Sequence, residues 1–272
     1  MSKVISSASS NAINYNHVIH DSISAEKFSI HYHDRCEIIF CMGGDVSYIA
    51  EGRSYKLSRG DIVISRPTVI HTIIPAENTT YERYDVIINQ KLLPTRIWDK
   101  LKRGRDVYHC LGNERIIDLT AKLDYYYKRF DDEDYARLVF NIVEEILYNL
   151  SELEGSNELA VSNPILDKAL AYIRENLTTL TGVEEISKAL YITKSHLHHL
   201  FSEHLQITPA KYITSKRLLL VQKRIRRGER PTAVFSECGF EDYATFYRNF
   251  KKHFGYSPAE EGKVEVKRQI LS

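Results

Sequence analysis

Apolar residues follow two different periods along this 272-residue chain, and the change of period divides it into two parts. Between Ile19 and about Asn89, short apolar runs are separated by turn signals such as Glu51-Gly52 and Gly60-Asp61. Short strands joined by such turns are typical of a β-barrel or a β-sandwich. From Asn113 onward, apolar residues recur every three or four positions, which predicts amphipathic helices. The pattern therefore predicts an all-β domain with flanking helices, followed by an all-α domain.

Two long helices are predicted at the end of the first part. The ranges Asn113–Phe130 and Tyr135–Leu153 each place apolar residues along one side. These apolar stripes can cover an open side of the barrel. The polar, glycine-containing stretch 154–162 is predicted to be a linker, and the serine-rich residues 1–18 are predicted to be a flexible arm.

The range 231–254 has the pattern of a helix, a tight turn and a second helix. Gly239 suits the turn, and Asp242 is placed to cap the second helix. In that second helix, Phe246 and Phe250 lie on one face while basic residues lie on the other. A helix with an aromatic back and a basic front, following a tight turn, is the layout of a major-groove reader.

A second helix-turn-helix pattern occupies residues 182–204. Thr193 is placed to cap a helix that runs from Lys194 to His204. The range Pro209–Arg227 then predicts one connecting helix, which at ~1.5 Å per residue spans about 28 Å. Successive major-groove faces on one side of DNA lie ~34 Å apart. One rigid helix can therefore hold both readers near consecutive grooves.

The residues that reach DNA are predicted from the exposed arcs of the two reader helices. Arg248 is the strongest single candidate for a contact with a base edge or a phosphate. Basic residues of the connecting helix and its end suit phosphate contacts, and include Arg217, Arg224 and Arg226. The predicted DNA-contacting residues are Lys194, Ser195, His198, His199, Tyr243, Ala244, Tyr247, Arg248 and Lys251.

Charge and cysteine content narrow the class of protein. The chain is nearly neutral overall, but basic residues outnumber acidic ones from Asn163 onward, and acidic residues predominate before it. The basic part fits nucleic acid, and the acidic part argues against DNA as its partner. The four cysteines form no CxxC pair, and no apolar run approaches ~20 residues. Free buried thiols and a soluble, cytoplasmic protein without a membrane partner are expected.

A group of metal-ligating residue types lies in the predicted β-domain. His31 and His33 point to the same face of a strand because side chains alternate with period two. Glu37 keeps that parity if the strand continues, and His71 can join from a neighbouring strand. Three imidazoles and a carboxylate on one inner face can hold Zn²⁺, Fe²⁺, Ni²⁺ or Mn²⁺. Without a metal, the same side chains can bind a polar effector in the barrel mouth or be purely structural.

Several short motifs in the second part match one family. They are Cys238-Gly239-Phe240, Phe246, Phe250-Lys251-Lys252, Gly255-Tyr256-Ser257-Pro258, Gln206-Ile207-Thr208-Pro209 and Tyr212-Ile213. With them the chain resembles the AraC/XylS-type bacterial transcription regulators, although Phe235 stands where that family usually carries a small residue. The range Ser29–His71 is similar to the two cupin motifs, and cupins form the effector-binding half of many such regulators.

This resemblance implies a sequence-specific DNA-binding transcription regulator and not an enzyme. Residues 19–153 would form a cupin-like domain for effector binding and dimerisation, and residues 163–264 an AraC-type DNA-binding domain. The expected partners are double-stranded promoter DNA, a small-molecule effector, RNA polymerase and a second copy of the chain, paired through helices within 113–153. Activation in response to a small molecule, with a sugar as one candidate, is the expected mode of action.

Two alternatives stay open beside that function. One is a metal-dependent cupin enzyme fused to a DNA-binding module, with the three histidines and the glutamate of the β-domain as its ligands. The other is a regulator whose first domain responds to protein partners. Metal analysis of the purified protein would separate the first alternative from the regulator.

Overall fold

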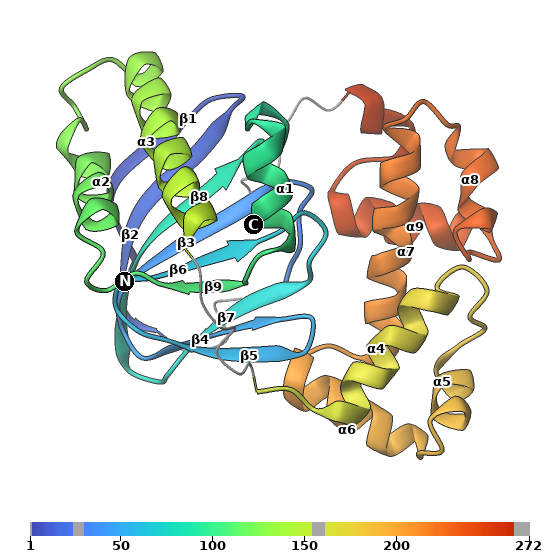
Figure 1. The fold of residues 1–272 in the computed structure, drawn as a ribbon. Coiled ribbons are helices and arrows are strands. Elements are labelled where there is room, and N and C mark those ends of the chain that lie inside the picture. The colour runs from blue at the N-terminus through green and yellow to red at the C-terminus, as the bar shows by residue number, and fades with distance from the viewer. Residues whose placement is uncertain (1, 24–29, 154–160, 264–272) are drawn as a thin grey trace. The chain divides into compact units, whose positions relative to one another are not determined.

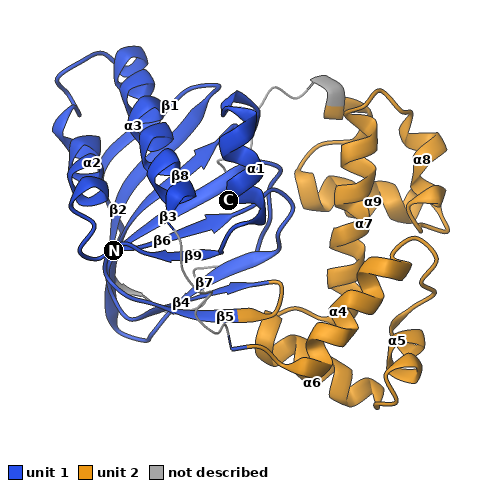
Figure 2. Ribbon diagram, viewed as in Figure 1, with its two compact units in different colours: residues 1–50, 54–161 blue, residues 51–53, 162–272 orange. Residues whose placement is uncertain are grey.

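The computed structural model describes residues 2–23, 30–153 and 161–263, and the chain divides into two compact units (Figure 2). Unit 1 comprises residues 1–50 and 54–161, and unit 2 comprises residues 51–53 and 162–272. Both β-sheets and three α-helices belong to unit 1, whereas the described residues 162–263 of unit 2 form helices joined by turns and loops. The predicted order of a β-domain with flanking helices and then an α-domain is thus confirmed. Within the described ranges, no helix is long and apolar enough to cross a membrane.

Unit 1 is built on two sheets. The six-stranded sheet has the order β1-β2-β8-β3-β6-β9, and the three-stranded sheet has the order β5-β4-β7 (Figure 1). The strands are β1 (Ser2–Ser9), β2 (Ile13–Ile23), β3 (Cys36–Gly43), β4 (Val46–Ala50), β5 (Arg53–Leu57), β6 (Asp61–Ser65), β7 (His71–Pro75), β8 (Thr79–Ile88) and β9 (Val107–His109).

The larger sheet is buried on both faces, so two apolar cores form. Ile39 of β3 faces the smaller sheet and packs with Tyr48 and Ile73. Its neighbour Ile38 points the other way, because side chains alternate, and packs with Tyr84 against the helices. The helices that cover this outer face are α1 (Thr95–Arg103), α2 (Glu114–Tyr125) and α3 (Asp132–Glu152), and the short 3-10 helix η2 spans Gln90–Leu92.

The N-terminal residues differ from the flexible arm that was predicted for residues 1–18. The described residues of that range form β1 and the first part of β2, and β2 pairs with β8 along its length. Ile13 and Tyr15 are fully buried and alternate with polar residues. The many serine and asparagine residues hid this alternation of apolar and polar positions in the sequence. Strand pairing and burial stabilise the strands in the folded chain. Most of the predicted linker 154–162 lies outside the described residues.

Unit 2 contains two helix-turn-helix arrangements joined by α7, which is drawn in orange in Figure 1. Asn163, Thr193, Thr208 and Asp242 each cap a helix, with a side-chain oxygen accepting a backbone N–H. The connecting helix ends two residues earlier than predicted. The helices are α4 (Pro164–Asn176), α5 (Val183–Ala189), α6 (Lys194–Leu205), α7 (Pro209–Ile225), α8 (Pro231–Glu237), α9 (Tyr243–Phe254) and the 3-10 helix η3 (Pro258–Lys263).

Candidate functional site

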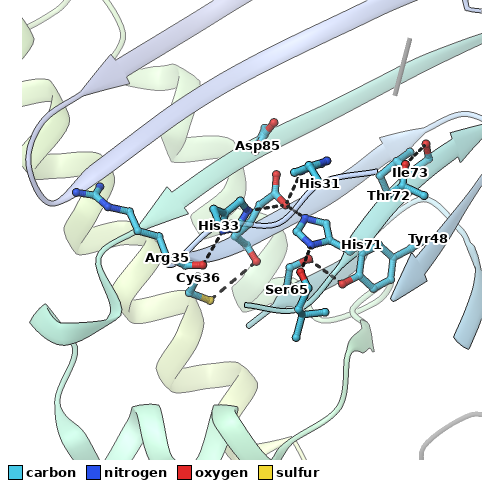
Figure 3. Close-up of polar contacts among 12 residues, drawn as sticks. His31, His33, Arg35, Cys36, Tyr48, Ser65, His71, Thr72, Ile73 and Asp85 are labelled. Atoms are coloured by element: carbon cyan, nitrogen blue, oxygen red, sulfur yellow. Dashed lines mark hydrogen bonds and ion pairs between the residues drawn. The ribbon is translucent and has the colours of Figure 1, made fainter. Parts of the chain in front are cut away.

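Four predicted ligand residues converge between the two sheets of unit 1 (Figure 3). His31 forms an isolated antiparallel bridge with His71, the first residue of β7, through backbone hydrogen bonds of 3.0 and 2.9 Å. Glu37 lies near the start of β3, in the larger sheet. Its Oε2 atom lies 2.6 Å from Nε2 of His71, 3.4 Å from Nε2 of His33 and 3.9 Å from Nε2 of His31.

Backbone carbonyl groups orient the two more deeply buried imidazoles of this four-residue cluster. Nδ1 of His33 lies 2.8 Å from the carbonyl oxygen of Arg35, and Nδ1 of His71 lies 2.9 Å from that of Val69. A carbonyl oxygen only accepts hydrogen bonds, so each Nδ1 carries a hydrogen and donates it. Each Nε2 is thereby directed at Glu37. Histidines that ligate metals are commonly oriented by such a second contact.

The charge of Glu37 is maintained inside the protein by its imidazole neighbours. Burial opposes ionisation, but hydrogen bonds from His33 and His71 outweigh it and hold the pKa of this carboxyl well below its usual range. Burial also disfavours the charged form of His33, yet the contact with Glu37 leaves the pKa of His33 raised. Glu37 is therefore a buried carboxylate held between two imidazoles, and these three side chains are nearly closed to solvent.

Asp85 and Arg83 on β8 are site residues that the sequence analysis did not identify. Nη2 of Arg83 donates to Oδ2 of Asp85 at 2.9 Å, while Oδ1 of Asp85 is buried without a hydrogen-bond partner among the described residues. Burial raises the pKa of Asp85 to about 7, opposed by Arg83 and reinforced by Glu37. Asp85 pairs with Ile39 in the β3–β8 register, so its side chain shares a face with Glu37. That register joins distant segments and is not visible in local sequence.

The four-residue cluster fits a divalent first-row metal ion. Its donor atoms all lie within 4.8 Å of one another. Donors bound tetrahedrally to one such ion at ~2.1 Å lie about 3.4 Å apart, so the widest pair would have to approach by about 1.4 Å at most to complete coordination. The side chains of His71, Glu37 and His33 are 1%, 5% and 9% exposed, whereas that of His31 is 48% exposed. An ion would therefore enter from the side of His31.

The first reader helix, α6, presents its predicted DNA-contacting residues to solvent. Oγ1 of Thr193 accepts a hydrogen bond from the backbone of His196, which starts α6, and Leu197 is fully buried beneath it. Lys194 already forms an ion pair of 2.7 Å with Glu184, so DNA would have to replace that contact. The predicted residues that are exposed on α6 are Lys194, Ser195, His198 and His199.

The second reader rests on an aromatic cluster. Asp242 accepts hydrogen bonds from the backbone of Ala244 and Thr245 at 3.2 and 2.7 Å, which caps α9. The ring of Phe235 lies 5.2 Å from Tyr243 and 6.0 Å from Phe246, so this large residue is accommodated by aromatic packing. Tyr243 is half-buried in this cluster. The predicted residues that are exposed on α9 are Ala244, Tyr247, Arg248 and Lys251.

Three arginines that were predicted to suit phosphate contacts are bound within unit 2. Arg217 donates to the carbonyl oxygens of Leu177 and Leu180, at 2.9 and 2.5 Å. Arg224 and Arg226 form ion pairs with glutamates of the same unit. Helix ends leave carbonyl groups without partners, and Arg217 supplies donors at the end of α4. These arginines therefore serve the internal structure of unit 2.

Two family models match the chain, one in each unit. Residues 18–109 match the AraC-like ligand binding domain, and residues 186–263 match a helix-turn-helix domain. Together the matches cover more than half of the chain. The model match in unit 1 includes all four residues of the cluster, and the match in unit 2 includes α6 through α9.

Similarity to named proteins extends across both units. The lactose operon transcription activator of Staphylococcus xylosus is 26% identical over 228 residues, covering 80% of each chain. The HTH-type transcriptional activator RhaS of Enterobacter sp. (strain 638) is 24% identical over 250 residues, covering 86% of this chain and 87% of its own. The solved structure of ToxT from Vibrio cholerae O395 is 14% identical, with a TM-score of 0.40, and covers 94% of this chain and 99% of its own. Because the two family models together cover more than half of the chain and the two curated relatives are transcription activators, the chain belongs to the AraC-type transcription regulators, with an AraC-like ligand-binding domain followed by a helix-turn-helix domain.

Proposed function

We propose that the chain acts as a homodimer that places its two readers in consecutive major grooves of promoter DNA under the control of a small molecule. The observation that carries this proposal is the pair of capped, polar-faced helices, α6 and α9, joined by the single helix α7. At ~1.5 Å per residue, the 17 residues of α7 span about 25 Å. This length suits readers that serve grooves ~34 Å apart, once the width of the helices is added.

Contacts with DNA are assigned to the exposed residues of the two readers. Arg248 is the principal candidate, because its guanidinium can bind a guanine edge or a phosphate and it is exposed on α9. In the DNA-free chain it donates only to Oγ1 of Thr245, at 3.1 Å, among the contacts of the described residues. A neutral side-chain partner of this kind is readily exchanged for a base or a phosphate.

Replacing Arg248 with alanine is expected to weaken specific DNA binding by about 10- to 100-fold, since one good arginine contact is worth ~1–3 kcal/mol. Fluorescence anisotropy with a labelled promoter fragment measures this change at several salt concentrations. Loss of a phosphate contact would lower the salt slope by about one and weaken all sequences equally. Arg174→Ala is the matched control, since Arg174 is exposed on α4, outside the readers. Equal losses in the two variants would contradict the assignment.

A footprint on promoter DNA tests the two-reader arrangement itself. Each chain should protect two neighbouring major grooves, and addition of the effector should alter that protection. Protection of one groove only would contradict the arrangement. A panel of sugars is the first choice of additives because a relative is named a lactose operon transcription activator. That name, with RhaS also named an activator, supports activation as the mode of action, and contact with RNA polymerase is the means that we propose for it.

The effector site is assigned to the space around the four-residue cluster, with Arg83 and Asp85 as further polar contacts. Concave sites that combine apolar walls with a few converging polar groups are the usual form of small-molecule sites. Here the cluster adjoins the core between the sheets, where the ring of Tyr48 lies 6.1 Å from that of His71. The relatives' names support a regulatory role for this site. A metal-dependent enzyme is the second candidate, because the cluster alone would also suit metal chemistry.

Dimerisation is assigned to the outer faces of α2 and α3. Ile117 and Tyr125 of α2 and Tyr148 of α3 are 49%, 57% and 43% exposed, which is unusual for large apolar side chains on two adjacent helices. A second copy of the chain could cover them through a twofold interface.

Ile117→Glu is expected to raise the dimer dissociation constant at least ~10-fold, because it would bury an unpaired carboxylate. Sedimentation velocity across a concentration series measures the shift from dimer to monomer. Leu111→Glu provides the control, since Leu111 is 73% exposed in unit 1 but lies outside both helices. A wild-type chain that stays monomeric at tens of micromolar would refute this interface.

A further inference from the structure

The hydrogen-bonding state of the cluster leaves a place for a cation. Nδ1 of both His33 and His71 donates to a carbonyl oxygen, so the Nε2 atoms are the ring nitrogens that can interact with Glu37 or with a bound ion. With Nδ1 engaged in this way, the Nε2 atoms of both rings point to the inside of the cluster, where they can bind a metal ion. Nε2 of His71 and Oε2 of Glu37 now lie 2.6 Å apart, so sharing an ion would move them to about 3 Å or more.

An ion at this place would be almost enclosed, since the side chains of His33, Glu37 and His71 are 9%, 5% and 1% exposed. It would accept lone pairs from the imidazole nitrogens and pair with the carboxylate directly. His31, whose Nε2 lies 3.9 Å from the same oxygen, supplies a further donor on the open side.

The surrounding charges also favour a cation. Asp85 faces Glu37 from β8 and brings a second carboxylate close to the cluster, with one oxygen that has no hydrogen-bond partner among the described residues. Arg83 balances part of that charge through its ion pair with Asp85. Three imidazoles with one carboxylate suit borderline divalent ions, whereas Mg²⁺ and Ca²⁺ prefer oxygen donors throughout.

We propose that His31, His33, Glu37 and His71 bind one divalent first-row transition-metal ion, which joins the two sheets of unit 1 and forms part of the regulatory site. Glu37 belongs to the six-stranded sheet and His71 to the three-stranded sheet, so a shared ion would link them. The proposed effector would then reach the ion through the open side at His31. This regulatory consequence rests on the function proposed above, whereas the binding of the ion does not.

Metal titration of the purified full chain tests the site directly. The chain is stripped with a chelator, exchanged into chelator-free buffer, and titrated with Zn²⁺ in competition with a chromophoric chelator. Co²⁺ is titrated in parallel, because its visible absorption reports the ligands around it. One ion per chain is expected in both titrations, together with a rise in the thermal unfolding midpoint. Substoichiometric binding of both ions, or binding without any change in midpoint, would overturn the proposal.

Two histidine-to-glutamine variants distinguish Zn²⁺ binding at the cluster from nonspecific Zn²⁺ binding at other histidines. His31→Gln removes a ligand whose side chain is 48% exposed, so the fold should persist, and Zn²⁺ affinity should fall at least ~10-fold. His109→Gln is the matched control, because its 41% exposed imidazole also pairs with a buried carboxylate, Asp61, outside the cluster. The control should keep wild-type affinity, and equal affinities in the two variants would overturn the proposal.

Measuring DNA binding on the same preparations keeps the two proposals distinguishable. A chain that binds promoter DNA but no metal overturns the metal site and leaves the regulator intact. A chain that binds one ion but no DNA supports the metal site and removes the proposed function. In Glu37→Gln, loss of metal together with a wild-type circular dichroism spectrum would give a second, independent support for the assignment.

Discussion

Replacing Gly239 with alanine is expected to destabilise unit 2 by about 3 kcal/mol and to release the second reader from DNA. The φ angle of Gly239 is +90°, where a Cβ atom costs ~1–2 kcal/mol. The new Cβ would also lie 2.6 to 2.9 Å from the guanidinium of Arg217. That guanidinium cannot move aside freely, because it donates to two backbone carbonyls beyond α4 and would lose charge-assisted hydrogen bonds worth ~1.5–3 kcal/mol each.

Gly228 offers a control with the same backbone strain but no steric conflict. Its φ angle is +95°, and no atom lies within 4 Å of an added Cβ. Gly228→Ala should therefore cost only about 1 kcal/mol. Thermal unfolding followed by circular dichroism compares the variants, and a footprint of Gly239→Ala should lose one of the two protected grooves. Equal shifts for both glycines would show that the conflict with Arg217 is unimportant.

A double-mutant cycle isolates the contribution of the guanidinium. In an Arg217→Ala background the Cβ at position 239 meets no guanidinium, so only the backbone strain remains. The cost of Gly239→Ala should then fall to about that of Gly228→Ala, a coupling of at least ~1 kcal/mol. Additive costs would contradict the steric explanation.

The helical unit was predictable because its determinants are local. Asp242, Gly239 and the spacing of Phe246 and Phe250 define the second reader within a few turns of chain, and the structure has helices at those positions. The inward direction of Arg217 was not predictable, since it depends on carbonyl groups beyond α4, forty residues away in the chain. The sequence shows that a helical residue is basic, but it does not show which group that residue will bind.

The site in unit 1 could be predicted only in part from local sequence, because strand pairing joins distant segments. Alternation placed His31 and His33 on one side, but only the bridge to His71 and the register of β3 bring Glu37 to them. Asp85 was missed for the same reason. A shift of register by one residue would send these side chains to the opposite face, so parity alone cannot define a site made from several strands.

Asp124→Asn is expected to lower the stability of unit 1 by about 3 kcal/mol near pH 5, because it leaves a buried imidazole without its main partner. Asp124 of α2 contacts the neighbouring strands β2 and β8, since its Oδ2 is 2.9 Å from Nδ1 of His17 and accepts a hydrogen bond from Tyr84 at 2.7 Å. Oδ1 accepts hydrogen bonds from Ser6 and Tyr15. An amide would turn one of these accepting oxygens into a donor and would remove the negative charge.

The loss should depend on pH in a defined direction. Burial disfavours ionisation of Asp124, but its hydrogen bonds hold the pKa at about 2, below the ordinary value of 3.8, so this stabilisation exists above pH 3.8 and disappears as the pH falls through 2. Burial lowers the pKa of His17, but Asp124 and Glu82 raise it above 6.5 overall. The imidazolium contribution is therefore complete below pH 6.5 and disappears as the pH rises through the raised pKa.

The difference between wild type and Asp124→Asn should consequently be largest between about pH 4 and 6.5 and should shrink on both sides. Urea unfolding of the full chain at a series of pH values measures it from the transition of unit 1. Asp118→Asn is the control on the same helix, since Asp118 is exposed and its ion pairs within the described ranges are with the surface cations Arg115 and Lys122. Its midpoint should follow wild type at every pH. A difference between wild type and Asp124→Asn that is constant from pH 4 to 9 would mean that hydrogen bonding alone joins α2 to the sheet. The expected maximum would show that the ion pair with His17 contributes, which would make the attachment of a proposed dimer helix sensitive to protons.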